Sequence, residues 1–177
     1  MKTSDYGIRP GTLADLSLLA HYDFSFEVRD EIVDPFEKMD SVPLRQPYRK
    51  DYGFDETDLT EYLIGPGKQL FVAVLNDIPI GYLAISEGWN KYAVVEDVAV
   101  AAGNRQGGVG RLLMDAAVHW ARDTGLAGVR LETQSTNISA CRFYSNYGFS
   151  LGGYDRFLYL GLYPETREIA LFWYLHF

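Results

Sequence analysis

The residues with the clearest chemical potential form a glycine-rich turn, GNRQGGVG at 103–110, between an apolar segment and a helical pattern. Backbone N–H groups in the first turn of a helix have no partner within the helix, and the helix dipole favours negative charge there. Glycines let the backbone approach an anion closely and adopt positive φ. The turn therefore predicts a phosphate-binding site, although a plain strand-to-helix turn would use the same residues.

Two nucleotide-binding motifs do not fit this turn. A P-loop needs Lys and then Ser or Thr after its last glycine, whereas Arg111-Leu112 follow Gly110. A dinucleotide fingerprint needs Gly-x-Gly-x-x-Gly in an early βαβ unit, whereas the spacing here is Arg105-x-x-Gly108-x-Gly110. Both motifs are therefore excluded.

The elements that must position the turn follow local patterns of apolar residues. Segment 94–100 is almost continuously apolar, as in a strand buried on both faces. Segment 23–60 has no clear period, and we expect an irregular, mobile, substrate-side region there, with short helices. The remaining patterns predict strands at 6–9, 70–75, 80–86, 129–134, 150–160 and 168–175, and helices that begin at Thr12 and cover 111–124 and 137–146.

Composition bounds the class of protein. The chain has 177 residues, which suits one domain over 1–177, and its net charge of −8 shows no basic stripe for nucleic acid. The acidic balance favours a cationic partner, although it equally serves solubility. The lone Cys141 forms no internal disulfide, and we find no signal peptide, no long apolar run and no histidine pair with metal-ligand spacing. We therefore expect a cytoplasmic protein without a bound metal or a membrane span.

The joint pattern resembles the GCN5-related N-acetyltransferase (GNAT) family. It consists of a strand, Arg-x-x-Gly-x-Gly, a helix, a strand, and then Asn137, Ala140, Tyr144 and Gly148-Phe149. The resemblance covers 70–160 and the opening IRPGTLADLSLL. It implies an α/β (α+β) fold in which helices flank a mixed, mostly antiparallel central sheet, with acetyl-CoA as co-substrate and a primary amine as acceptor.

The resemblance also implies which residues bind acetyl-CoA. The strand residues Val98, Ala99 and Val100 match the strand whose backbone bonds the pantetheine arm, and Asn137 and Tyr144 match later contacts. The family usually has glycine directly after the arginine of the loop, whereas this chain has Gln106, which the loop tolerates only if its φ is negative. The residues that match the pyrophosphate loop are Arg105, Gln106, Gly107, Gly108, Val109, Gly110 and Arg111.

Three side chains are candidates for proton transfer. Tyr144 fits the family's tyrosine and could protonate the departing thiolate, although it could simply pack with Phe143 and Tyr147. Glu132 has the spacing of the glutamate in ribosomal-protein alanine acetyltransferases, and Glu96 shares a strand face with Val98 and Val100 by period two. Either glutamate could take the amine proton, directly or through water, or merely anchor a cationic substrate.

A closer resemblance, to the streptothricin acetyltransferases, extends beyond the acetyl-CoA motif, up to the final ALFWYLHF. It implies acetylation of the β-lysine arm of a cationic antibiotic. Carboxylates and aromatic faces suit such an acceptor. The residues implied for acceptor binding are Tyr48, Trp89, Asn90, Asp97 and Asp155.

Two other functions stay open. The acceptor could be an aminoglycoside or a protein N-terminus, or the chain could bind coenzyme A without turnover. We expect no nucleic-acid partner. The edge strands near the C-terminus could pair in a homodimer.

Overall fold

The computed structural model describes residues 6–177, and these divide into two compact units. Unit 1 contains the described residues up to Ser25, Asp51–Val129 and Phe177, and unit 2 contains Phe26–Lys50 and Arg130–His176. The single domain over 1–177 stays a prediction.

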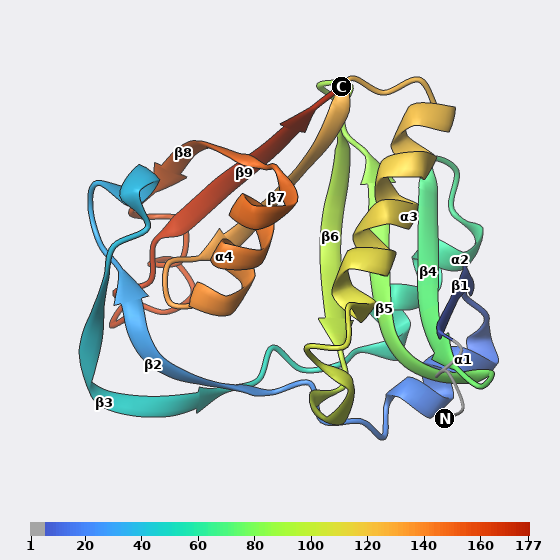
Figure 1. The fold of residues 1–177 in the computed structure, drawn as a ribbon, viewed down its shortest axis with the longest axis horizontal. Helices are drawn as coiled ribbons and strands as arrows, with labels where there is room; N and C mark the ends of the chain where they lie inside the picture. The colour runs from blue at the N-terminus through green and yellow to red at the C-terminus, as the bar shows by residue number, and fades with distance from the viewer. Residues whose placement is uncertain (1–5) are drawn as a thin grey trace. The chain divides into compact units, whose positions relative to one another are not determined.

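Unit 1 contains an antiparallel sheet with strand order β1-β4-β5-β6 (Figure 1). A two-residue turn joins β4 to β5, and Asn76 and Asp77 adopt φ of 49° and 66° there. Asparagine and aspartate tolerate this left-handed conformation, which tight hairpins need. The strands are β1 (Tyr6–Pro10), β4 (Lys68–Leu75), β5 (Ile78–Glu87) and β6 (Ala93–Val100).

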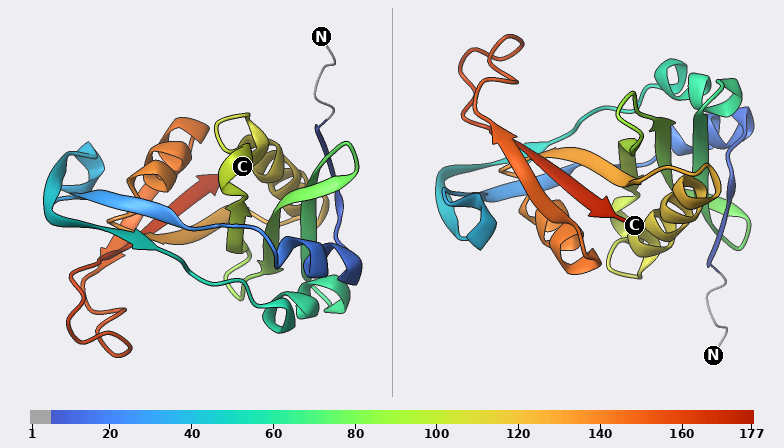
Figure 2. Two further views of the ribbon diagram at one scale, coloured as in Figure 1. Left: turned by 90° about the horizontal axis from the view of Figure 1, so that it is seen from below. Right: turned by 90° about the horizontal axis from the view of Figure 1, so that it is seen from above.

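Helices cover both faces of this sheet (Figure 2). On one face, α1 (Leu13–Leu19) and α2 (Glu56–Ile64) bury leucines against β4 and β5, and α3 (Val109–Asp123) lies on the other face. The helix predicted to begin at Thr12 starts with a capping box of Thr12 and Asp15, and Arg9 donates two 2.7 Å bonds to the Asp15 carboxylate. These contacts fix the start of α1.

Unit 2 contains a second group of strands and one α-helix (Figure 1). Its strands β7, β9 and β8 lie in that order, and β2 pairs with β3 in a separate antiparallel ribbon. A short 3₁₀ turn, Phe36–Lys38, lies between β2 and β3. The elements are β2 (Phe26–Ile32), β3 (Ser41–Lys50), β7 (Gly128–Gln134, of which the part from Arg130 belongs to unit 2), α4 (Ile138–Tyr147), β8 (Ser150–Asp155) and β9 (Ala170–His176).

The predicted fold class, with helices flanking mostly antiparallel strands, is confirmed. Segment 23–60 is more regular than expected, since it holds β2 and β3 as well as the start of α2. The strand predicted at 150–160 ends at Asp155, whose carboxylate accepts a 2.7 Å bond from the Phe157 N–H and begins a turn. Among residues 6–177, no helix combines the length and the apolar character that a membrane span requires.

Candidate active site

The predicted phosphate loop joins β6 to α3 in unit 1. Gly108, the N-cap of α3, has φ of 84°, and no side chain among the described residues caps the helix there. Because the first turn of α3 carries no acidic residue, its N–H groups suit an anionic ligand. The loop therefore fits a diphosphate.

Arg105 does not point its charge at such a ligand. Its guanidinium donates to three backbone carbonyls, those of Val100 (2.9 Å), Ser25 (2.8 Å) and Phe24 (2.7 Å). The side chain thus fastens the loop to the segment before β2, and the backbone of the loop is the part that suits the diphosphate.

Gln106 does not meet the condition of a negative φ, because its φ is 65°. This value lies in the left-handed region that favours glycine. A side chain held there stores about 1–3 kcal/mol of strain. Gln106 therefore keeps the loop conformation that glycine would adopt without strain.

Replacing Gln106 by glycine is expected to raise the free energy of unfolding by about 1 kcal/mol, because the strain exceeds the added backbone entropy of the unfolded chain. Thermal unfolding should show a Tm about 2–4 °C higher. Gly108→Ala, at φ of 84°, is the matched control and should lower the Tm. A lower Tm for Gln106→Gly would contradict this account.

A β-bulge lies in the middle of β6. Ala84 pairs with Asp97, whereas Ile85, the next residue on β5, pairs with Val95, so that Glu96 is an extra residue. Bulges re-aim side chains and are frequent beside active sites. The prediction that 94–100 is buried on both faces holds only for its start, since Glu96 and Asp97 are exposed.

The bulge places both carboxylates on one face of the sheet. Glu96 accepts a 2.6 Å bond from Ser86, and Asp97 accepts a 2.7 Å bond from Tyr82. Ser86 and Tyr82 lie four residues apart on β5 and share a face. From Asp97 onward, alternation puts Ala99 on this face and Val98 on the other. The expectation that Glu96 shares a face with Val98 and Val100 is therefore wrong.

Aromatic rings pack around Tyr82, whose hydroxyl bonds to Asp97. Phe24 stacks on Phe54 with ring centroids 5.7 Å apart, and both meet the ring of Tyr82 edge-on. Burial and the charges of Glu96 and Glu61 raise the pKa of Tyr62 to about 12. This face of unit 1 thus combines negative charge with aromatic surface, which suits a cationic ligand.

Asp97 reaches solvent although protein surrounds it. Desolvation raises the pKa of Asp97, and the hydrogen bonds from the Tyr82 hydroxyl and the Val98 N–H oppose that rise. Asp97 is thus a largely desolvated carboxylate that keeps contact with water.

A hollow of about 480 Å³ lies at the end of β5 in unit 1. Trp89 borders it and is 90% exposed, so the ring contributes nothing to the core. Asn90 is outside the lining, and its side-chain oxygen accepts a 3.4 Å bond from the Tyr92 N–H. Ser86, the donor to Glu96, also lines the hollow, which therefore adjoins the bulge.

Asn137 and Tyr144 lie on α4 in unit 2. Asn137 is the N-cap and accepts a 3.2 Å bond from the Ala140 N–H, and Tyr144 is buried among Phe149 and Trp173. Burial raises the pKa of Cys141 on the same helix to about 12. A thiol with this pKa is inert at neutral pH, as expected for a packed cysteine.

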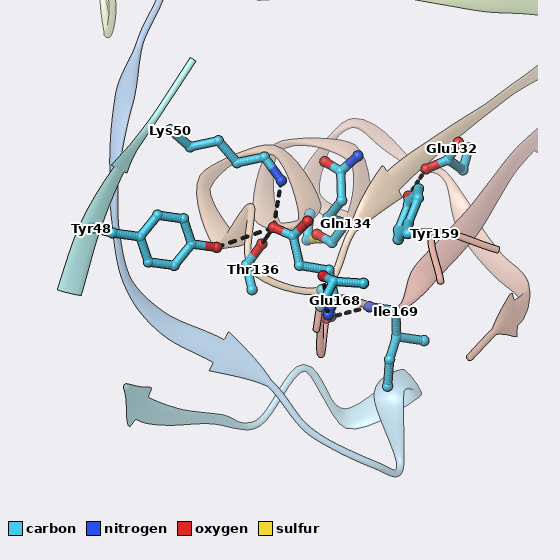
Figure 3. Close-up of polar contacts among 11 residues, drawn as sticks. Tyr48, Lys50, Glu132, Gln134, Thr136, Tyr159, Glu168 and Ile169 are labelled. Atoms are coloured by element: carbon cyan, nitrogen blue, oxygen red, sulfur yellow. Dashed lines mark hydrogen bonds and ion pairs between the residues drawn. The ribbon is translucent and has the colours of Figure 1, made fainter. Parts of the chain in front are cut away.

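Glu132 and Asp155 also lie in unit 2, and each carboxylate accepts a hydrogen bond from another residue of the unit. The Tyr159 hydroxyl donates to Glu132, and Asp155 accepts from the Phe157 N–H. Figure 3 shows Tyr159 reaching Glu132. A hydrogen bond therefore links the segment after β8 to Glu132, one of the two candidate bases.

Tyr48, on β3 in unit 2, donates its hydroxyl to Glu168 at 3.1 Å, and Lys50 forms an ion pair with the same carboxylate (Figure 3). Burial and the charge of Glu168 raise the pKa of Tyr48. The described residues 6–177 contain no cluster of His, Cys, Asp and Glu that could hold a metal ion.

Comparison with known proteins identifies the family. The profile of the Acetyltransferase (GNAT) family matches residues 27–149. The chain belongs to the GNAT family. It is therefore an N-acetyltransferase, and the strand–loop–helix arrangement from β6 to α3 is the part of this GNAT chain that suits the diphosphate.

Three relatives of this GNAT chain are informative. Streptothricin acetyltransferase A of Bacillus subtilis (strain 168) is 42% identical over 132 residues, which cover 75% of each chain. A crystal structure described as a streptothricin acetyltransferase from Bacillus anthracis str. Ames, in complex with acetyl coenzyme A, has a TM-score of 0.86 at 32% identity and covers 98% of this chain and 100% of that one. A nourseothricin acetyltransferase structure has a TM-score of 0.80 at 30% identity and covers 97% of this chain and 98% of that one.

Sequence reasoning missed several residues of the site. The apolar pattern around Tyr82 is typical of a buried strand. Nothing in the local sequence indicates that the Tyr82 hydroxyl donates a hydrogen bond to Asp97. Glu168 contacts Tyr48 across a separation of 120 residues, which no local pattern reveals. Tyr159 lies in a segment predicted as the end of a strand.

Proposed function

We propose that this chain transfers an acetyl group from acetyl-CoA to a primary amine of streptothricin, on its β-lysine arm. The observation that carries the proposal is the pair of carboxylates, Glu96 and Asp97, which the bulge in β6 places on one face beside aromatic rings. Such a surface recognises a polycation. The 42% identity to a streptothricin acetyltransferase supports this choice of acceptor.

The residues at the cofactor end supply binding and orientation. The backbone of Val98, Ala99 and Val100 would bond the pantetheine arm, and the N–H groups of the loop 105–111 would hold the diphosphate. The relative whose structure contains acetyl coenzyme A supports this assignment. Bound acetyl-CoA would supply the thioester that the amine attacks, and the chain would contribute proximity.

We assign proton transfer to three side chains. Tyr144 would donate a proton to the departing thiolate, and Glu132 or Glu96 would take the proton of the amine, directly or through water. Both glutamates already accept hydrogen bonds, from Tyr159 and Ser86, which fix their orientation. Acceptor binding would involve Tyr48, Trp89, Asn90, Asp97 and Asp155. The lone buried cysteine agrees with a cytoplasmic location.

The proposed acceptor is tested by fragment-ion mass spectrometry after incubation of the protein with acetyl-CoA and an equimolar mixture of streptothricin, an aminoglycoside and a peptide with a free N-terminus. We expect one acetyl group on the β-lysine fragment of streptothricin and none on the other amines. Acetylation of the aminoglycoside or the peptide instead would favour another acceptor. Retained acetyl-CoA with no acetylated amine would favour a binding module without turnover.

A further inference from the structure

Glu168 is the centre of a polar cluster in unit 2 (Figure 3). Its Oε1 atom accepts hydrogen bonds from the Thr136 hydroxyl (2.7 Å) and the Tyr48 hydroxyl (3.1 Å), and it forms an ion pair with Lys50. Three donors from two distant parts of the sequence thus converge on one carboxylate oxygen.

The cluster is largely removed from water. The side chains of Lys50 and Glu168 are 17% and 15% exposed. Burial acts to raise the pKa of Glu168, but the bonds from Lys50 and Thr136 outweigh it, and the net shift is downward. Glu168 is therefore ionised at neutral pH and offsets the charge of Lys50.

Hydrogen bonds next to the cluster connect the segments that carry it. Ser135 and Ile169 exchange two bonds, from the Ser135 N–H to the Ile169 carbonyl (2.9 Å) and from the Ile169 N–H to the Ser135 hydroxyl (3.1 Å). The Ile32 N–H donates to the Ser135 carbonyl at 2.9 Å. The ribbon β2–β3, the turn before α4 and the segment before β9 therefore meet at Glu168.

We propose that Glu168 is a positioning residue for acceptor recognition. It holds the Tyr48 hydroxyl and offsets the Lys50 cation, so that β3 presents an aromatic ring to a cationic acceptor. The ring of Tyr48 is available for this contact, since the residue is 42% exposed. Without the carboxylate, Lys50 would repel the acceptor and Tyr48 would lose its orientation. This inference rests on the proposed function.

The test is the steady-state kinetics of Glu168→Gln with streptothricin and acetyl-CoA. Glutamine keeps the shape of the side chain and removes its charge. We expect the KM for streptothricin to rise about tenfold, with kcat and the KM for acetyl-CoA changed by less than about twofold, because ground-state binding of the acceptor alone is lost. Adding Lys50→Gln should recover most of the affinity for streptothricin, because it removes the cation that Glu168 offsets.

Glu165→Gln is the matched control, because Glu165 is exposed and lies three residues away. It should leave all constants unchanged. If Glu168→Gln does not fold, Tyr48→Phe, which keeps the ring and releases it from Glu168, should raise the KM for streptothricin about threefold. An unchanged KM for streptothricin, or an equal loss for both substrates, would overturn the role of Glu168. A wild-type protein that does not acetylate streptothricin would overturn the proposed function itself, and this role with it.

Discussion

Replacing Tyr144 by phenylalanine is expected to lower kcat about 10²-fold, whereas acetyl-CoA still binds. The substitution removes only the hydroxyl, and the ring keeps its contacts with Phe149 and Trp173. Without the phenol, the thiolate must leave unprotonated or take its proton from water. Stopped-time thiol release gives kcat, and calorimetric titration gives the affinity for acetyl-CoA.

Tyr147→Phe is the matched control for this measurement. Tyr147 lies one turn further along α4 and packs its ring on Phe143 and Phe149. Loss of its hydroxyl should change kcat by less than about twofold. The acid role of Tyr144 would be contradicted by a kcat for Tyr144→Phe that equals that of the wild type.

Replacing Arg105 by alanine is expected to destabilise unit 1 and to weaken acetyl-CoA binding together. The change removes three charge-assisted bonds to the carbonyls of Val100, Ser25 and Phe24. Because the side chain is partly in water, we expect a loss of about 2 kcal/mol in the free energy of unfolding. A loosened loop should raise the KM for acetyl-CoA about tenfold, or about 1.4 kcal/mol.

Two further variants separate geometry from charge at Arg105. Arg105→Lys keeps the charge, but an ammonium group cannot reproduce the three guanidinium bonds. Its Tm and its KM for acetyl-CoA should therefore resemble those of the alanine variant. Arg167→Ala removes an exposed arginine of unit 2 and should leave both the Tm and the KM unchanged. If Arg105→Lys retains full stability and affinity, the guanidinium bonds are not what holds the loop.

Elements with strong local signals could be predicted from the sequence. The segment predicted as a helix at 111–124 is α3, and the strands predicted at 70–75 and 80–86 lie within β4 and β5. The spacing of apolar residues and the turn residues at the ends predict these elements, and both signals lie within the element or next to it. The capping box at Thr12 follows from two residues three apart.

Elements that depend on distant partners could not be predicted. Strand β3 is mostly exposed and carries Pro43 and Pro47, so it has no apolar period, and its position depends on β2 and on Glu168. The bulge at Glu96 depends on how β6 registers against β5, which no pattern within β6 reveals. The positive φ of Gln106 likewise follows from the path of the whole loop.

The most direct test of the central claim is the rate of thiol release from acetyl-CoA as the concentration of streptothricin is raised. We predict a saturable rate above the hydrolysis background, with one acetyl group gained by the antibiotic for each thiol released. A folded protein that binds acetyl-CoA but shows only background release at every concentration of streptothricin would contradict it.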